Sequence, residues 1–175
     1  LSNYRTTADC MPHLLDEKNV ALLTAHRVYS EAELKARCEI MLENYCKTIT
    51  IEANTMTGMA RKLILPAVSG FAAETAGKAA AKRALSAELD CSYETELVRR
   101  LSGLTDEIAA GTNELEAAVQ ALSEAGSVRE EAEMIRDTVL EKMSALRKPC
   151  DEAETLTEKS FWPFPTYGDL LFGVK

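Results

Sequence analysis

The sequence has no long apolar run and no excess of positive charge. Its longest apolar candidate, LILPAV at residues 63–68, is far shorter than the roughly 20 residues that a membrane-spanning helix needs. No apolar stretch follows a basic start, so we expect no signal peptide. The net charge is -8, and the basic residues are scattered among acids rather than clustered. Binding to nucleic acid or to an anionic membrane is therefore not expected.

Cysteine and histidine are too sparse for a disulfide framework or a metal centre. Cys38 and Cys46 lie on one predicted helix, about 12 Å apart along its axis, which is too far for a disulfide. The odd number of cysteines and the absence of a CxxC pair favour reduced thiols in a cytoplasmic protein. Cys10 and His13 have the spacing of metal ligands but lack a second pair. The sequence therefore predicts no metal ligand and no bound cofactor in this chain.

Catalytic motifs are also missing. The stretch GFAAETAGK at residues 70–78 has too many residues between its glycines for a phosphate-binding P-loop, and alanine follows its lysine. There is no GxSxG motif and no Glu-x-x-His pair of the kind that helical di-metal sites use. Lys78, Lys82 and Arg83 could bind an acidic partner, although a solvated helix face explains them better. We predict that this chain contains no catalytic residue.

What the sequence does contain is helix. Aromatic residues make up only 6%, and alanine is abundant, which favours close-packed helices. Ser30 and Glu33 form a capping box, in which each side chain binds the other's backbone N–H. The helix that it opens has an apolar stripe with spacings of three and four. Pro66 predicts a kink or an end near residues 62–66. The stripe consists of Cys38, Leu42, Tyr45, Ile49, Ala53, Met56, Ala60, Leu63 and Ala67.

The clearest pattern is a coiled-coil seam from Leu97 to Ala125. Gly111 lies on the seam and would let a partner helix approach closely. Gly126 is expected to end this helix, and Ser127 with Glu130 forms a second capping box. The next stripe runs from Val128 to Ala153 after a very short loop, so the two helices must run antiparallel. Pro149 is expected to interrupt the second one. The seam consists of Leu97, Leu101, Leu104, Ile108, Gly111, Leu115, Ala118, Leu122 and Ala125.

The predicted fold class is all-α: an antiparallel bundle of long helices, coiled-coil-like, with an irregular aromatic C-terminal tail. We expect short helices over residues 1–29, the long-helix bundle over 30–158 and the tail over 159–175. The residues from 90 to 92 should break the helical run.

The tail, SFWPFPTYGDLLFGVK, holds half of the aromatic residues of the chain. An aromatic run left in water promotes association, so we predict that the tail docks on an apolar surface. Pro163 and Pro165 should preset an extended path, and Gly168 should allow a turn before DLLF. The tail could equally fold back on its own bundle. The predicted docking residues are Phe161, Trp162, Phe164, Tyr167, Leu170, Leu171 and Phe172.

Three stretches resemble a known family. They are YRTTADCMPHLLDEKNVALL (4–23), YSEAELKARCEIMLENYCKTITIEANTMTGMARKLILPAV (29–68) and WPFPTYGDLLF (162–172). All three are similar to the C-terminal portion of type III glutamine synthetases, the long-subunit bacterial form. The likeness is collinear and covers both ends, and it is weaker between about residues 70 and 155. Because the chain begins with Leu1 rather than methionine, we expect it to be a fragment of a longer polypeptide.

This resemblance implies much about the parent enzyme and less about the chain. The family makes glutamine from glutamate, ammonia and ATP, using Mg or Mn held by motifs that lie upstream of Leu1. Residues 4–36 would be the end of the catalytic domain, and the remainder would be the helical extension of type III. The implied partners are the upstream catalytic domain and further subunits of a dodecamer-like homo-oligomer. The tail would then dock on the catalytic domain or on a neighbouring subunit.

Two other functions remain open at this point. The same seam would suit a free-standing helical interaction or adaptor module. A small all-helical enzyme would instead require a polar pocket inside the bundle.

Overall fold

The structure is a computed structural model that describes residues 3–173, without the side chain of Tyr167. All regular elements in this part are helical, so the all-α prediction is confirmed. None of these helices combines the length and the apolar character that a membrane crossing requires. The chain forms two compact units, Leu1–Thr55 with Leu115–Met143 (unit 1) and Met56–Glu114 with Ser144–Lys175 (unit 2). The predicted division at residues 29 and 158 followed sequence patterns and stays a prediction.

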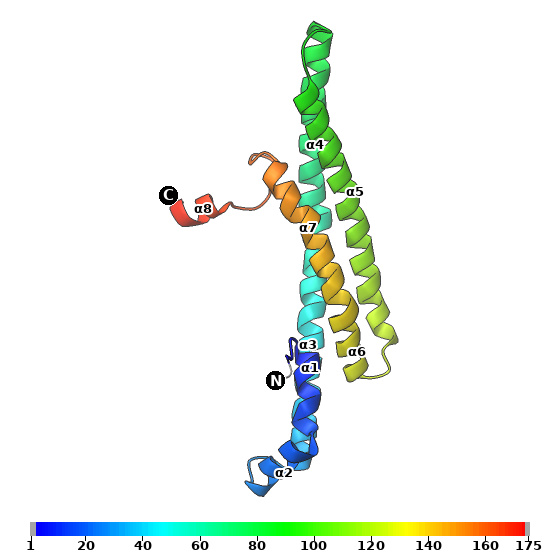
Figure 1. Ribbon diagram of the computed structural model, residues 1–175, viewed down its shortest axis with the longest axis vertical. Coiled ribbons are helices and arrows are strands. Elements are labelled where there is room, and N and C mark those ends of the chain that lie inside the picture. Colours follow the sequence, from blue (N-terminus) through cyan, green and yellow to red (C-terminus); the bar gives the residue numbers. More distant parts are fainter. Residues whose placement is uncertain (1–2, 174–175) are drawn as a thin grey trace. The chain divides into compact units, whose positions relative to one another are not determined.

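Long helices dominate the chain, and short 3₁₀ and π turns join or interrupt them (Figure 1). The 3₁₀ turns are η1 (Met11–Leu15) and η3 (Leu122–Glu124), and the π turns are η2 (Ala60–Ile64) and η4 (Ile135–Val139). The α-helices are α1 (Thr7–Cys10), α2 (Glu17–Ala25), α3 (Glu31–Met59), α4 (Leu65–Leu85), α5 (Ser92–Ala121), α6 (Val128–Met134), α7 (Leu140–Leu156) and α8 (Tyr167–Phe172).

Unit 1 is built around the first part of α3. The capping box at its start is confirmed, because Ser30 N–H donates to the Glu33 carboxylate at 2.7 Å and Glu33 N–H donates back to the serine hydroxyl at 3.3 Å. The α1 end of the unit is tied to η4 by an ion pair of 3.0 Å between Arg136 and Asp9. The buried residues of this unit are Ala8, Leu34, Cys38, Leu42, Cys46, Ala53, Leu115, Leu122, Ala132, Ile135 and Val139.

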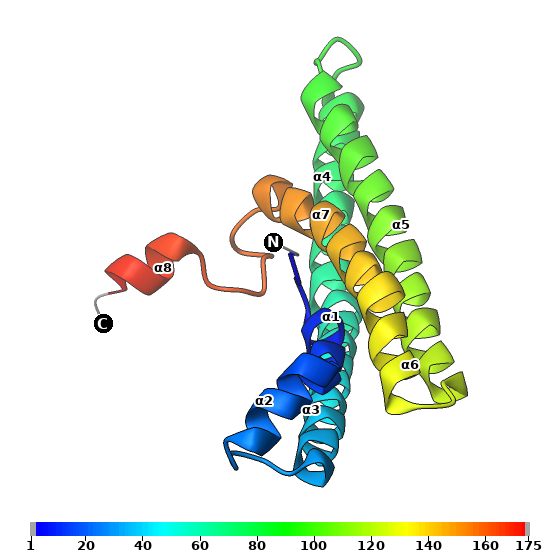
Figure 2. The same cartoon turned by 60° about the horizontal axis from the view of Figure 1, so that its bottom comes forward.

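In unit 2, α4 and α5 lie side by side and run antiparallel (Figures 1 and 2). Lys82 forms an ion pair with Glu94 near the turn that joins them, and Arg61 donates to Asn113 at 2.9 Å farther along. The break between the two helices spans residues 86–91, close to the predicted position.

The predicted seam on α5 faces α7 in unit 2. Leu101, Leu104 and Ile108 are fully buried. Gly111 lies against Leu146 of α7, since a Cβ built on the glycine would be 3.3 Å from the leucine Cδ1 atom. Arg100 donates to the Glu152 carboxylate at 2.6 Å, and these two contacts together show that α5 and α7 run antiparallel. The long-helix bundle predicted from the stripes is therefore confirmed.

The stripe on the first long helix was wrong after Ala60. Leu63 was predicted to be buried but is 42% exposed, whereas Ile64 and Val68 are buried. The π turn η2 explains the change, because it contains one residue more than an α-helical turn and shifts every later residue on the face. This wide turn immediately precedes Pro66, where it gives the proline ring room beside the preceding carbonyls. The helical path therefore continues through Pro66 instead of ending there.

One further expectation about these helices was wrong. Pro149 does not interrupt its helix, since α7 runs through it to Leu156. Gly126 lies where it was expected, directly after the C-cap residue Ala125, although no described glycine has a positive φ. Gly126 donates its N–H to the Glu130 carboxylate at 2.9 Å. Ser127 caps α6 as predicted, so the second capping box forms in one direction only.

Candidate interaction site

The predicted docking tail begins where α7 ends. Beyond Thr157 the chain makes a turn in which the Glu158 carbonyl accepts from the N–H of Phe161 at 2.9 Å and from that of Trp162 at 3.1 Å. This turn sets the first aromatic side chains of the tail at a defined place on unit 2.

Phe161 packs against α4 of unit 2. Its ring centroid is 5.5 Å from that of Phe71, with an interplanar angle of 51°, which is a favourable tilted contact. The ring also lies beside Gly70, where a Cβ would be in ordinary van der Waals contact with it at 3.5 Å. The sequence patterns missed this contact, because it joins residues that are far apart in the chain. For this residue, the tail folds back on its own unit.

Trp162 and Phe164 contact each other. Their ring centroids are 5.9 Å apart in an edge-on arrangement, and both side chains are half-buried. The indole N–H of Trp162 and the hydroxyl of Thr157 are buried and find no hydrogen-bond partner among the described residues. A buried donor without an acceptor costs free energy, so the Trp162 side chain is held by its ring contact and not by a side-chain hydrogen bond.

The end of the tail is a short capped helix. Thr166 and Asp169 form a full capping box at the start of α8, and Lys159 forms an ion pair with Asp169. The Lys159 ammonium, together with the N–H and hydroxyl of Thr166, lowers the pKa of Asp169 to about 2. Gly168 lies inside this helix, so the expected turn there was wrong. The side chain of Tyr167 lies outside the part that the structure describes.

The last predicted docking residues are open to solvent. Leu170, Leu171 and Phe172 are 66%, 72% and 79% exposed. The structure thus divides the predicted site into two parts. In the first part, Phe161 packs on Phe71, and Trp162 contacts Phe164. In the second part, Leu170, Leu171 and Phe172 of α8 are largely exposed among the described residues. Docking of the tail on another surface stays a prediction.

The Cys10 and His13 pair does not form a metal centre in the described residues. Cys10 is exposed, and the imidazole Nδ1 of His13 lies 3.0 Å from the Asp16 carboxylate while its ring stacks on Tyr4 at 4.5 Å. Within residues 3–173, no group of three or more His, Cys, Asp or Glu side chains could hold a metal ion.

The cysteines are free thiols, as predicted. Four of them are buried, and burial raises the pKa of both Cys46 and Cys150 to about 11. Such thiols are almost fully protonated at neutral pH and are poor nucleophiles. Only Cys10 is exposed among the cysteines.

The basic residues of α4 are engaged with their neighbours. Lys78 pairs with Glu74 at 2.7 Å, and Lys82 pairs with the largely buried Glu94 and holds the pKa of that carboxyl below its ordinary value. The guanidinium of Arg83 donates to the Thr95 hydroxyl at 3.1 Å. The hypothesis of an acidic partner for these residues gains no support from this arrangement.

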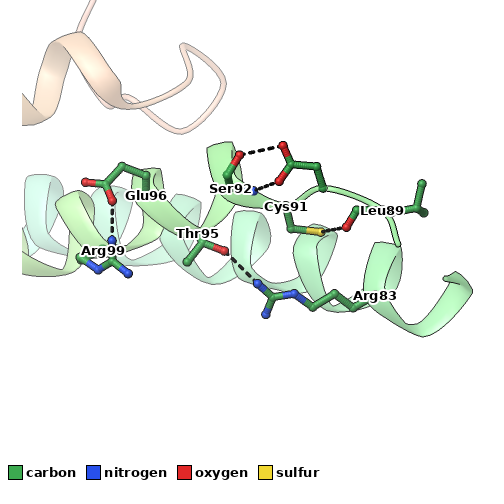
Figure 3. Close-up of a pocket in the computed structure, with 8 residues that line it drawn as sticks. Arg83, Leu89, Cys91, Ser92, Thr95, Glu96 and Arg99 are labelled. Atoms are coloured by element: carbon green, nitrogen blue, oxygen red, sulfur yellow. Dashed lines mark hydrogen bonds and ion pairs between the residues drawn. The ribbon is translucent and has the colours of Figure 1, made fainter. Parts of the chain in front are cut away.

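A surface pocket of about 550 Å³ lies beside Arg83, at the turn between α4 and α5 (Figure 3). Its charged groups are engaged by neighbouring side chains, and Arg83 donates to Thr95. Asp90 accepts from the N–H and the hydroxyl of Ser92, both at 2.9 Å, and Arg99 pairs with Glu96. The two arginines and two acids give the pocket no excess charge that would select a ligand.

Comparison with known proteins gives a consistent set of relatives. Residues 1–83 match the family described as the glutamine synthetase C-terminal domain. Over its full length the chain is 30% identical to a glutamine synthetase of Butyrivibrio fibrisolvens. Over 98% of its length it is 26% identical to a type-3 glutamine synthetase of Dictyostelium discoideum and 24% identical to a glutamine synthetase of Bacteroides fragilis. The chain spans only 25%, 24% and 24% of these three relatives. The resemblance that the sequence patterns indicated is confirmed.

Proposed function

Since the chain corresponds over its whole length to the C-terminal region of glutamine synthetases, we propose that it is the helical C-terminal domain of the type III form. The match to a protein named as type-3 supports this assignment. The long-helix bundle supports it too, because the resemblance implied a helical extension at this place in the subunit.

In this proposal, the upstream part of the polypeptide catalyses the reaction. The parent enzyme would join ammonia to glutamate with ATP in the cytoplasm, using Mg or Mn bound by residues outside this chain. Three quarters of the length of each relative lies outside the matched region, which leaves room for such a catalytic domain. ATP turnover or tight metal binding by the purified 175-residue chain would contradict this division of roles.

The proposed role of this chain is to support assembly. The bundle is held together by buried leucines, such as Leu101 and Leu104, and by the ion pair between Arg100 and Glu152 on two antiparallel helices. The tail is anchored on that bundle through Phe161 and ends in exposed apolar side chains on α8. The observation that carries the proposal is that the whole chain matches a glutamine synthetase while it spans only 25% of that relative. The partner surfaces would belong to the catalytic domain or to other subunits of a homo-oligomer.

Deletion of residues 161–175 from the full-length enzyme tests the tail. We expect a smaller assembly in sedimentation analysis and a lower melting temperature, because the exposed side chains of α8 would lose their contact surface. Substitution of Leu171 by aspartate should reproduce the change in assembly while the Phe161 anchor stays in place. If neither variant changes oligomer size or melting temperature, the tail has no docking role.

A further inference from the structure

A hollow of about 510 Å³ lies in unit 1, where η1, the first half of α3 and the start of α6 meet. Its apolar walls are the buried side chains of Cys38 and Leu42 on α3, the half-buried Pro12 and Val128, and Leu15. A space of this size with mostly apolar walls is typical of a site for a small molecule. It is called the η1–α3 hollow below, and neither the assembly role nor the reaction uses it.

Contacts of two cysteines join the three walls of the η1–α3 hollow. The Cys38 thiol donates to the Met11 carbonyl at 3.4 Å, which ties η1 to α3. The Cys46 thiol lies 3.8 Å from the Val128 carbonyl, which ties the start of α6 to the same helix. The walls therefore belong to one packed unit, and the hollow exists before any ligand binds.

The charged groups of the η1–α3 hollow leave one carboxylate uncompensated. Glu39, Glu43 and Arg129 line it. The Glu43 carboxylate pairs with Lys47 at 3.1 Å, and the Arg129 guanidinium pairs with Glu133 at 3.0 Å. Glu39 has no hydrogen bond or ion pair with any residue that the structure describes. The hollow thus combines apolar walls with an excess of negative charge.

The Cys38 thiol in the wall responds to this charge. Burial raises the pKa of Cys38, and the Glu39 carboxylate raises it further, while Arg129 acts in the opposite direction. The thiol therefore stays protonated at neutral pH and is a poor nucleophile. A ligand of the hollow would be selected by the charge of Glu39 and by the apolar walls, and not by bond formation with sulfur.

We propose that the η1–α3 hollow binds a small organic cation, a primary alkyl ammonium whose charge lies against Glu39 and whose chain covers the apolar walls. Such an amine is protonated at neutral pH, as the side chain of lysine is. Burial of the alkyl chain and attraction between opposite charges both favour the complex. Because the ligand contacts three elements of unit 1 at once, its binding would stabilise that unit.

The experiment is equilibrium dialysis of radiolabelled hexylamine against the full-length protein at neutral pH. Hexanol and hexanoate have the same chain length but are neutral and anionic, so they serve as comparison ligands. We expect hexylamine to bind, and the other two to bind more weakly by about fivefold or more, because they lose the attraction to Glu39.

Two matched variants locate the charge. Glu39→Gln keeps the size of the side chain and should weaken hexylamine binding by about fivefold. Glu52→Gln removes an exposed carboxylate of the same helix outside the hollow and should not change the affinity. Both side chains are exposed, so neither substitution disturbs the core. Binding at any other site of the protein is the same in all variants and cancels in the comparison.

A photoreactive probe locates the chain. A primary alkylamine that carries a diazirine should label peptides containing residues 12–15, 38–43 or 127–129, and excess hexylamine should prevent the labelling. Absence of hexylamine binding at millimolar concentration would overturn the proposal. Equal affinity of Glu39→Gln and the parent, equal binding of hexanol or hexanoate, or labelling confined to other peptides would overturn it as well.

Discussion

Replacement of Gly111 by alanine tests the close approach of α5 and α7 in unit 2. A Cβ at Gly111 would lie 3.3 Å from Cδ1 of Leu146 and 3.6 Å from its Cα, whereas a Cβ at Gly103 on the same helix would have no atom within 4 Å. In a helix interior, alanine in place of glycine raises the free energy of unfolding by about 0.5–1 kcal/mol. We expect Gly103→Ala to show this gain in full. Gly111→Ala should gain about 0–0.5 kcal/mol, because the leucine methyl has to move.

A larger side chain separates the two positions further. Gly111→Val adds two methyl groups beside the Leu146 backbone, and such overpacking costs about 1–3 kcal/mol. Gly103→Val should cost only the smaller helix propensity difference between valine and alanine, offset by the loss of glycine. Urea unfolding followed by far-UV circular dichroism gives the free energies, provided that the slope with denaturant stays constant. Equal gains for the two alanine variants, or a Gly111→Val protein as stable as the parent, would refute the packing of these helices.

Three further results are expected from the same chain. A thiol reagent at neutral pH should label the exposed Cys10 at once. Cys46 should react only after unfolding, because burial raises the pKa of its thiol to about 11. Rapid labelling of Cys46 in the folded chain would contradict its buried position. Phe161→Ala should lower the free energy of unfolding by about 1–2 kcal/mol because the Phe71 contact is lost, whereas Phe172→Ala, at a residue 79% exposed, should not change it. The cap of α8 should be stable above pH 4 and be lost as the pH falls toward 2, because the pKa of Asp169 is lowered from 3.8 to about 2 in the folded chain; amide NMR shifts of α8 that stay constant over this range would contradict the ion pair.

The long helices could be predicted from the sequence because the signals for a helix are local. The capping box of Ser30 and Glu33 and the three- and four-residue spacing on α5 each depend on residues within one or two turns. Leu101, Leu104 and Ile108 were therefore placed in the core correctly. The antiparallel pairing followed from the short loop after α5, since two helices joined in this way have little choice of direction.

The π turns could not be predicted from periodicity. A stripe of apolar residues looks continuous across η2, because Leu63 and Ile64 are both apolar and adjacent in sequence. Only the three-dimensional path shows that the extra residue turns Leu63 outward and Ile64 inward. Pro66 indicated that the helix would be irregular here. The sequence did not show that the irregularity would be a π turn, which accommodates the proline ring without ending the helix.

The candidate site was recognised in part. The composition of the tail identified the aromatic residues, but the seat of Phe161 at Phe71 depends on a contact between residues far apart in the chain. The capping box of Thr166 and Asp169 was present in the sequence and would have predicted α8 in place of a turn at Gly168.

Removal of residues 37–175 from the full-length protein tests the proposed assembly role of this domain, with the assembly mass measured by sedimentation and glutamine formation measured on the same samples. We expect that the truncated subunits no longer form the large assembly, while the proposed catalytic residues remain in the polypeptide. A truncated enzyme that keeps both its full assembly mass and its full rate would contradict the role of this helical domain.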